Sequence, residues 1–424
     1  MKYAIITFGC KVSQYESSVI DNAMKAAGYE PCNDGDKPDI VIVNSCTVTE
    51  NSDSKAKRAV RRAHASGAVT VLTGCYPQAF REEAAQCGAD IVTGTARRVE
   101  IPALIGKFLA GCPAVPDLTL PSEYEETGNT ATADKTRSFI KVEDGCDRYC
   151  SYCAIPFARG AVRSRKPESI AEEAALCAGA GHRELVLAGI NLSRYGSDIG
   201  LGLADAVKAA STPQSIVRVR LSSLEPELLD ERTAAALAEC EKLCPHFHLS
   251  LQSGCDSTLR RMNRHYDTEE YSAIVSRLRS NFPNCAITTD VIVGFPGETE
   301  EEFRESLRFV ENAGFARVHV FTYSKRPGTA AARMPGQLPD EVKVRRHAEM
   351  SGAAARIYRD FLVSHTGRTE FILVQKRTSP EYAEGLTPDY APVRVYGSRA
   401  ERHDIIKVYV IGTGEKFCIG EEIL

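Results

Sequence analysis

The sequence lacks any apolar run long enough to cross a membrane, and it lacks an excess of charge of one sign. No stretch approaches the ~20 apolar residues of a transmembrane helix, and the N-terminal run Tyr3–Phe8 is too short for a secretory signal. The 52 Lys and Arg residues are balanced by 56 Asp and Glu residues, which gives a formal net charge of −4. The chain is therefore no polycation, and any contact with nucleic acid must come from local basic patches. We expect no membrane contact.

Cysteine, by contrast, is abundant, with 15 residues in a chain of 424. An oxidising compartment would leave such an odd, large set prone to scrambling, whereas a reducing cytosol suits metal-bound thiolates. The length predicts two to four domains, and an apolar content of 43% is enough for sizeable cores. We therefore expect a soluble, cytoplasmic protein in which some cysteines bind metal.

Three of the cysteines, Cys146, Cys150 and Cys153, lie within eight residues in a C-x3-C-x2-C pattern. A closed zinc site needs four protein ligands, and a four-iron cluster needs one ligand per iron. Three thiolates on a four-iron cluster leave one iron open, which indicates chemistry rather than scaffolding. The spacing resembles that of the radical S-adenosylmethionine (SAM) enzymes, in which the open iron holds SAM. The alternative is a zinc loop completed by a distant Cys or His.

Residues 1–112 alternate short apolar runs with helix-like stretches, which predicts a parallel α/β sheet. The expected strands are Tyr3–Phe8, Asp39–Asn44, Val69–Thr73 and Ala89–Thr93. Cys10, Cys46 and Cys75 each follow one of the first three strands. Because ligands of open parallel sheets bind beyond the carboxyl ends of the strands, these cysteines are predicted to converge on a second cluster. For any one of them alone, the alternative is a small buried core residue.

Residues 113–136 are rich in Pro, Thr and acidic residues, which predicts a linker. Residues 137–363 then carry six strand candidates in α/β alternation, which favours an open, partial (β/α)6 barrel. The candidates are Ser138–Val142, Glu184–Ile190, Val217–Ser222, His246–Leu251, Ile287–Val293 and Arg317–Tyr323. The C-x3-C-x2-C loop follows the first candidate, so we expect the cluster at the carboxyl-terminal rim of the barrel.

Several polar and turn residues fall on the same rim, and together they predict a SAM pocket. For each residue alone, the alternative is an ordinary helix cap or turn. The predicted cofactor contacts are Tyr152, Asn191, Ser222, Glu225, Gln252 and Val293.

The end of the chain, residues 364–424, consists of short β-type runs separated by Gly, Pro and Asp, which predicts a small all-β barrel. Basic residues are denser beside the two cysteine trios, where a phosphate-rich substrate would need positive charge. The alternative for such a run is a solvated surface. The candidates are Lys55, Lys57, Arg58, Arg61 and Arg62 after Cys46, and Arg159, Arg163 and Arg165 after Cys153.

These features together resemble the radical SAM methylthiotransferases, whose C-terminal domain is called TRAM, over nearly the whole chain. The sequence departs from the family pattern at Ser13, where Asn is usual, and the C-terminal barrel is a looser match. The matching strings are Gly9–Val12, Asn44–Thr49, Thr73–Pro77, Gly145–Cys153, Ala158–Gly160, Arg163–Arg165, Leu221–Ser223, Leu251–Gly254, Asp290–Thr299, Tyr323–Ser324 and Arg326–Thr329.

The resemblance implies two [4Fe-4S] clusters, on Cys10, Cys46 and Cys75 and on Cys146, Cys150 and Cys153, with SAM as the cofactor. Reductive cleavage of SAM at the second cluster would allow hydrogen abstraction from carbon 2 of an adenine, and the first cluster would hold the sulfur to be inserted. The strings around Cys46 and the helix after it resemble the branch that acts on N6-threonylcarbamoyladenosine in tRNA, 3′ of the anticodon. Implied partners are this tRNA, through Lys57, Arg58, Arg61, Arg62, Arg159, Arg163 and Arg165, an electron donor such as flavodoxin or ferredoxin, and a sulfur source.

Two alternatives remain at this point. Other branches of the same family modify isopentenyladenosine in tRNA or an aspartate of a ribosomal protein. A non-catalytic iron–sulfur or zinc protein that binds RNA through its C-terminal barrel would hold metal without cleaving SAM.

Overall fold

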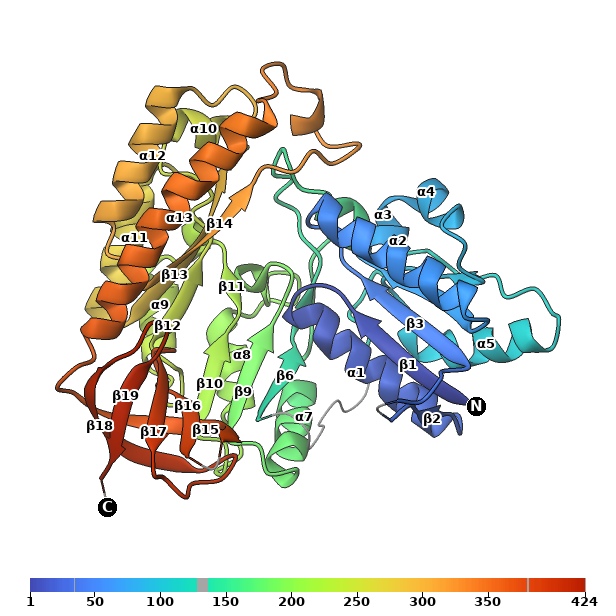
Figure 1. The fold of residues 1–424 in the computed structure, drawn as a ribbon, viewed down its shortest axis with the longest axis horizontal. Coiled ribbons are helices and arrows are strands. Elements are labelled where there is room, and N and C mark those ends of the chain that lie inside the picture. The colour runs from blue at the N-terminus through green and yellow to red at the C-terminus, as the bar shows by residue number, and fades with distance from the viewer. Residues whose placement is uncertain (34, 128–135, 380, 424) are drawn as a thin grey trace.

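The structure, a computed structural model, describes residues 1–33, 35–127, 136–379 and 381–423. Its elements form three groups along the chain: an α/β sheet domain, a larger α/β barrel and a small all-β barrel (Figure 1). The predicted fold class is therefore confirmed. No helix in the described part of the chain is both long and apolar enough to span a membrane.

The N-terminal group is a parallel five-stranded sheet in the order β2-β1-β3-β4-β5. Two apolar layers cover its faces. One includes Ile20 of α1 and Ile105 of α5, and the other includes Val60 of α2 and Tyr76 of α3. The elements are β1 (Lys2–Thr7), α1 (Lys11–Ala26), β2 (Glu30–Pro31), β3 (Ile40–Ser45), α2 (Glu50–Ala65), β4 (Val69–Gly74), α3 (Cys75–Ala79), α4 (Arg81–Ala85), β5 (Ile91–Val92), η1 (Arg98–Glu100) and α5 (Ile101–Leu109).

The middle group is a partial barrel made of two parallel sheets, β10-β9-β6 and β11-β12-β13-β14. A parallel bridge between Val219 and Leu243 joins the two sheets. The first half contains β6 (Arg137–Lys141), β7 (Glu143–Asp144), α6 (Ile155–Arg159), β8 (Arg163–Ser164), α7 (Pro167–Gly179), β9 (Glu184–Ala188), η2 (Leu192–Arg194), α8 (Leu203–Ala210), β10 (Arg218–Leu221), β11 (Ser223–Leu224) and η3 (Pro226–Leu228).

The second half continues the α/β alternation and ends in a long helix. Its elements are α9 (Glu231–Ala238), β12 (His246–Leu249), α10 (Asp256–Arg261), α11 (Thr268–Asn281), β13 (Ala286–Val293), α12 (Glu300–Asn312), β14 (Arg317–Thr322), η4 (Ala331–Arg333) and α13 (Asp340–Val363). One continuous apolar core joins the strands to these helices. The helix α13 packs along β14 and leads into the C-terminal group.

The C-terminal group is a closed barrel in the order β15-β16-β17-β19-β18. Its strands are β15 (Thr369–Ser379), β16 (Tyr382–Leu386), β17 (Pro392–Tyr396), β18 (Ile405–Thr413) and β19 (Cys418–Glu422). It lies at the end of the larger barrel where Arg218 and Arg220 project: Arg218 donates to the carbonyls of Leu386 and Phe371, and Arg220 to that of Pro388. The small barrel therefore lies against the end of the larger barrel from which its strands start, opposite their carboxyl ends (Figure 1).

The predicted linker at 113–136 lies partly outside the described residues, at 128–135. Its described part forms no helix or strand and runs along both neighbouring groups. The carbonyl of Leu118 accepts from Gln78 and Arg81, and the hydroxyl of Tyr124 donates to the carbonyl of Lys141.

Candidate active site

The N-terminal trio occupies the carboxyl ends of three neighbouring strands. Cys10 caps α1 after β1, Cys46 follows β3, and Cys75 opens α3 directly after β4. Burial and the neighbouring Cys75 and Cys10 thiols raise the pKa of Cys46 to about 12. The three thiols are thus within electrostatic range of one another on one edge of the sheet, as the spacing predicted.

Two glycines allow the backbone to approach this closely. Gly9 has φ 131°, and a Cβ there would lie 2.9 Å from Cys46 Cβ and 2.6 Å from Ser13 Oγ. Gly74 has φ 102°, and its Cβ would lie 2.3 Å from the Ser45 carbonyl. Any side chain at either position would push the cysteine-bearing loops apart. Ser13, where the sequence departs from the family pattern, places its Oγ 3.8 Å from Cys10 Sγ.

The barrel trio lies on the loop after β7, held by the turn that follows α10. The Ser151 hydroxyl and backbone amide donate to the carbonyls of Arg261 and Met262, and the Asn263 amide donates to the Tyr149 carbonyl. Burial raises the pKa of Cys146 to about 11. The loop is thus fixed by the barrel before any metal binds.

Each trio contains one thiol that accepts from a buried arginine, and each of those arginines is paired with a glutamate. Arg159 Nε lies 3.2 Å from Cys75 Sγ, and its guanidinium is bound by Glu16. Arg264 Nη1 lies 3.2 Å from Cys150 Sγ, and its guanidinium is bound by Glu225. Such donors stabilise thiolates, the form in which cysteine binds metal.

Neither trio has the spacing of a zinc site. A tetrahedral zinc with Zn–S bonds of about 2.3 Å brings its sulfurs to about 3.8 Å from one another. Within the described residues, the one group of three His, Cys, Asp or Glu ligand atoms that all lie within 4.8 Å of one another is His248, Asp290 and His319. The cysteines are therefore more widely spread than one zinc ion requires, which suits a larger cluster.

Two buried polar atoms beside Cys146 lack a hydrogen-bond partner among the described residues. They are Glu143 Oε1 and Asn191 Oδ1. The Asn191 amide lies 3.7 Å from Cys146 Sγ, and its backbone N–H donates to the other Glu143 oxygen. Unpaired buried acceptors are costly, so they indicate a ligand that brings donors, such as the amino group or hydroxyls of SAM. The unpaired oxygens beside Cys146 therefore fit the implied cofactor.

The predicted SAM contacts divide into three sets. Tyr152 and Gln252 share a cavity of about 160 Å³ with Asp290. The Asn191 amide lies beside the Cys146 thiol, Glu225 binds Arg264, which donates to Cys150, and the Ser222 hydroxyl accepts from the backbone of Gly189. The Val293 side chain is 1% exposed and belongs to the barrel core, and the Val293 carbonyl accepts from the amide of Tyr323. The Val293 side chain therefore faces the core, and the predicted contact of Val293 with the cofactor stays a prediction.

The cavity of about 160 Å³ lies between the two cysteine loops. Its wall includes Tyr152, from between Cys150 and Cys153, and Val48 and Thr49, which follow Cys46. The remaining wall comes from Gln252, which follows β12, and from residues of β13 and of the end of β14. One small space thus borders both predicted cluster sites.

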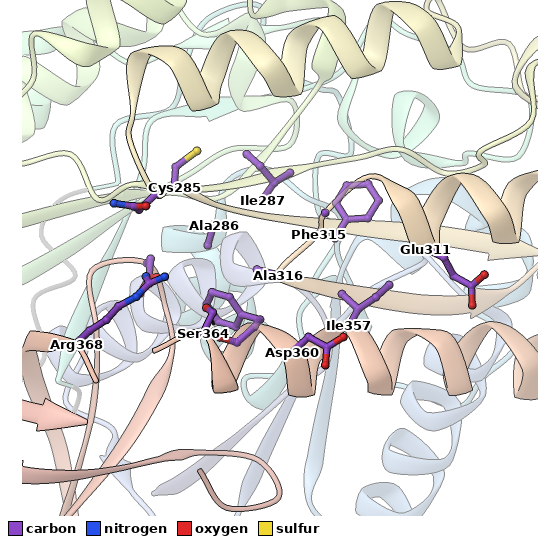
Figure 2. A pocket seen from close by; sticks show the side chains of 14 residues that line it. Cys285, Ala286, Ile287, Glu311, Phe315, Ala316, Ile357, Asp360, Ser364 and Arg368 are labelled. Carbon is purple, nitrogen blue, oxygen red and sulfur yellow. Dashed lines mark hydrogen bonds between the residues drawn. The ribbon is translucent and has the colours of Figure 1, made fainter. Parts of the chain in front are cut away.

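A second cavity, of about 300 Å³, lies elsewhere (Figure 2). Ile357, Asp360 and Ser364 of the α13 region line it together with Cys285 and Ala286 at the start of β13. This is the end of β13 opposite the cysteine loops, and none of the predicted site residues lines it. The cavity is not part of the candidate site.

The two basic groups differ in exposure. On α2, Lys55, Arg58, Arg61 and Arg62 are exposed, whereas Lys57 is half-buried and paired with Glu83. Arg159, Arg163 and Arg165 are all buried. Arg163 is paired with Asp144, and Arg165 is paired with Glu126 and Glu173. Because these three charges are already paired with carboxylates, their positions do not favour direct contact with phosphates, and the predicted contact with tRNA stays a prediction.

Sequence reasoning missed the carboxylates that organise the site, namely Glu16, Asp53, Glu143 and Asp144. Glu16 carried a signal, because it stands on the helix face that also holds the buried residues Val12, Val19 and Ile20. Arg326 binds Asp53 and the Thr47 hydroxyl from across the domain boundary. The sequence indicated Arg326 only as part of the matching family string Arg326–Thr329.

The radical SAM superfamily matches residues 140–310, and an uncharacterized protein family designated UPF0004 matches residues 2–94. The chain is 37% identical to the threonylcarbamoyladenosine tRNA methylthiotransferase MtaB of Thermotoga maritima, over 95% of this chain and 93% of the relative. It is 34% identical to the MtaB of Bacillus subtilis, over 99% of this chain and 95% of the relative. It is 32% identical to the tRNA-2-methylthio-N(6)-dimethylallyladenosine synthase of Pelotomaculum thermopropionicum, over 88% of this chain and 86% of the relative.

Among solved structures, the radical SAM methyltransferase TsrM of Kitasatospora setae, with cobalamin and a [4Fe-4S] cluster bound, shares the fold. The TM-score is 0.57 at 15% identity, over 90% of this chain and 76% of the other. The close relatives cover nearly the whole chain, and the superfamily match spans the C-x3-C-x2-C loop and the barrel strands around it. The chain belongs to the radical SAM methylthiotransferase family of enzymes.

Proposed function

We propose that the protein methylthiolates carbon 2 of N6-threonylcarbamoyladenosine in tRNA, at the adenosine 3′ of the anticodon. The observation that carries the proposal is the cavity whose wall combines Tyr152 of the barrel loop with Val48 and Thr49 of the Cys46 loop. A reacting atom that enters between these loops is within reach of both cysteine trios. The product would be 2-methylthio-N6-threonylcarbamoyladenosine.

The choice of nucleoside is supported by the relatives. The chain is 37% and 34% identical to two relatives named for threonylcarbamoyladenosine, against 32% for the relative named for dimethylallyladenosine. The short string Cys46–Thr49 and the basic helix after it favour the same branch.

Each cysteine trio would hold one [4Fe-4S] cluster with one iron left open, and SAM would bind at the barrel trio. Cys146, Cys150 and Cys153 would hold the cluster that supplies one-electron reduction of SAM, and Cys10, Cys46 and Cys75 would hold the cluster that supplies the site for the sulfur to be transferred. Arg264 and Asn191 hold the barrel thiols, and the Glu143 and Asn191 oxygens without a partner among the described residues would accept from SAM. The walls formed by the two loops would help to exclude water from the reaction.

The reaction also needs a reductant and a source of sulfur. We propose that a small electron carrier such as flavodoxin or ferredoxin supplies the electron and that a separate sulfur donor recharges the N-terminal trio. These partners follow from the reaction itself, because no residue of the chain can supply net electrons or sulfur over repeated turnovers.

The tRNA would approach along α2. This helix begins four residues after Cys46 and exposes Lys55, Arg58, Arg61 and Arg62. Phosphates of the anticodon stem-loop would contact these side chains while the adenosine leaves its stack, which costs a few kcal/mol, and enters between the loops.

Nucleoside mass spectrometry of total tRNA from a deletion strain tests the substrate. We expect threonylcarbamoyladenosine to accumulate without its methylthio group, and complementation with the intact chain to restore the modification. Unchanged methylthio-threonylcarbamoyladenosine, in a strain with no second enzyme of this type, would rule the substrate out. Loss of the methylthio group from isopentenyladenosine instead would assign the other tRNA branch.

A further inference from the structure

A buried group of charges connects the two cysteine trios. Arg159 is the last residue of α6, six residues after Cys153, yet its Nε lies 3.2 Å from Cys75 Sγ of the other trio. The Arg159 side chain is 1% exposed and Cys75 is 3% exposed. One side chain of the barrel thus donates to a predicted cluster ligand of the N-terminal domain.

The guanidinium of Arg159 is fixed on its other edges. Both of its Nη atoms donate to the two Glu16 carboxylate oxygens, and Nη1 is 3.3 Å from each oxygen of Asp144. A planar fork held at this many points keeps its remaining N–H directed at one atom. That atom is Cys75 Sγ.

The group is not balanced in charge. Glu16 contacts Arg98, Lys141 and Arg159, and Asp144 contacts Lys141, Arg159 and Arg163. Four cations share two carboxylates among the described residues, which leaves a surplus of two positive charges. Buried charge is costly unless it is paired, so the group favours negative charge at the place where Arg159 points.

We propose that Arg159 is a positioning residue that stabilises negative charge on the cluster of Cys10, Cys46 and Cys75 and so raises its reduction potential. The inference rests on the proposed second cluster. One-electron reduction adds one negative charge to the cluster and its thiolate ligands, and a hydrogen bond to a ligand sulfur stabilises that charge. The same contact fixes Cys75 to the barrel, which sets the sulfur-carrying site against the site of SAM cleavage.

The test uses the full chain with Cys146, Cys150 and Cys153 replaced by Ala, so that the N-terminal cluster alone remains. An anaerobic redox titration followed by electron paramagnetic resonance gives the midpoint potential of that cluster. In this background we expect Arg159→Gln to lower the ratio of reduced to oxidised cluster at a fixed potential about tenfold, equivalent to about 59 mV for one electron.

Arg98→Gln is the matched control. Arg98 is also buried and lies 2.8 Å from the same Glu16, but its guanidinium donates to the carbonyl of Thr95 rather than to a thiol. We expect it to shift the ratio far less than Arg159→Gln. An equal shift would show that the charge of the group, and not the Arg159 contact, sets the potential, and would overturn the proposal.

A measurement without substitution at Arg159 guards against a variant that does not fold. The same Cys→Ala background, labelled with 15N-arginine, should show 15N hyperfine coupling on the reduced cluster in pulsed electron paramagnetic resonance. Absence of that coupling would overturn the proposal while leaving the cluster itself established. A background that binds no iron would overturn the second cluster first, and with it the role of Arg159.

Discussion

Buried pairs of charge, rather than exposed charge, join the N-terminal domain to the barrel. Besides the group around Arg159, a second buried contact joins the two parts. The Arg326 guanidinium binds Asp53 and the hydroxyl of Thr47, the residue that follows Cys46. The side chains of Arg326 and Asp53 are 3% and 8% exposed. Removing one member of such a pair leaves the other charge buried without a partner, which costs far more than losing a pair at the surface.

The first prediction follows from this contrast. Arg326→Ala should destabilise the contact between the N-terminal domain and the barrel by roughly 3–5 kcal/mol, because Asp53 stays buried without its cation. Amide hydrogen exchange read at the start of α2 and at the Cys46 loop measures the loss. The exchange rate there should rise steeply, with little change in the C-terminal barrel.

Arg345→Ala is the control for that prediction. Arg345 pairs with Glu300 at 2.6 Å, but the two side chains are 47% and 40% exposed. Removing an exposed pair should cost only about 0.2–1 kcal/mol. If the two substitutions caused equal losses of stability, burial would not explain the contribution of the Arg326–Asp53 pair.

At the residue scale, the sequence was informative wherever function fixes a spacing. The positions of the six cysteines could be predicted, because strand ends and a short loop determine where they lie, while their role as cluster ligands stays a prediction. The burial of Arg159 could not be predicted, because its partner Glu16 is 143 positions away in the sequence. A basic run after a cysteine loop is the same string whether it faces phosphate or a buried carboxylate.

At the scale of elements, α2 combines a fixed start with an exposed basic surface. The Thr49 hydroxyl caps it by accepting from the Ser52 amide, and the Glu50 amide donates to Ser324 of the barrel at 3.1 Å. The helix is thus anchored at the end near the cysteine site, while Arg58, Arg61 and Arg62 extend away from it in solvent.

The second prediction concerns this surface. Arg58→Glu combined with Arg62→Glu should weaken tRNA binding and methylthiolation, because two phosphate contacts become repulsive and the salt dependence of binding should fall with them. SAM cleavage in the absence of tRNA should be unchanged. Binding of the anticodon stem-loop, measured at several salt concentrations, separates the two effects.

A matched reversal of charge elsewhere controls for net charge. Lys208→Glu with Arg232→Glu changes two exposed residues on α8 and α9, on the helical outside of the barrel. That pair should leave tRNA binding close to the unaltered level. Equal weakening by both pairs would mean that α2 is no specific surface for tRNA.

Most elements followed from periodicity, and the exceptions have physical reasons. All four predicted N-terminal strands occur close to their predicted ranges, although Ala89–Thr93 shortens to the two-residue β5, and the short β-type runs predicted after residue 364 form the strands of the small barrel. The helix α13 was not predicted. Its buried side chains are Arg346, Met350, Ala353, Ala354 and Leu362, which give too weak an apolar stripe for a helix of 24 residues.

At the scale of the whole molecule, the chain places the two cysteine loops on either side of one small cavity. The barrel trio is held by contacts within the barrel, from Asn263, Arg264 and Asn191. The N-terminal trio is held by its own sheet edge, by Gly9 and Gly74, and by barrel contacts from Arg159 to Cys75 and from Arg326 to Thr47 beside Cys46. Because neither of these barrel contacts comes from Cys146, Cys150 or Cys153, each cluster should assemble without the other.

The last prediction tests that independence. Replacing Cys10, Cys46 and Cys75 by Ala should remove half of the iron from the anaerobically reconstituted protein, because each trio would bind one four-iron cluster. This variant should still cleave SAM reductively, since no contact that holds Cys146, Cys150 or Cys153 comes from the N-terminal trio. It should form no methylthio product, because the sulfur-carrying site is gone.

The reverse variant, with Ala at Cys146, Cys150 and Cys153, should keep the other half of the iron and lose SAM cleavage altogether. Iron analysis with assays for 5′-deoxyadenosine and methylthio nucleoside distinguishes the two. If the first variant kept its barrel cluster and yet failed to cleave SAM, the two sites would act as one unit, and the division of labour proposed for them would be wrong.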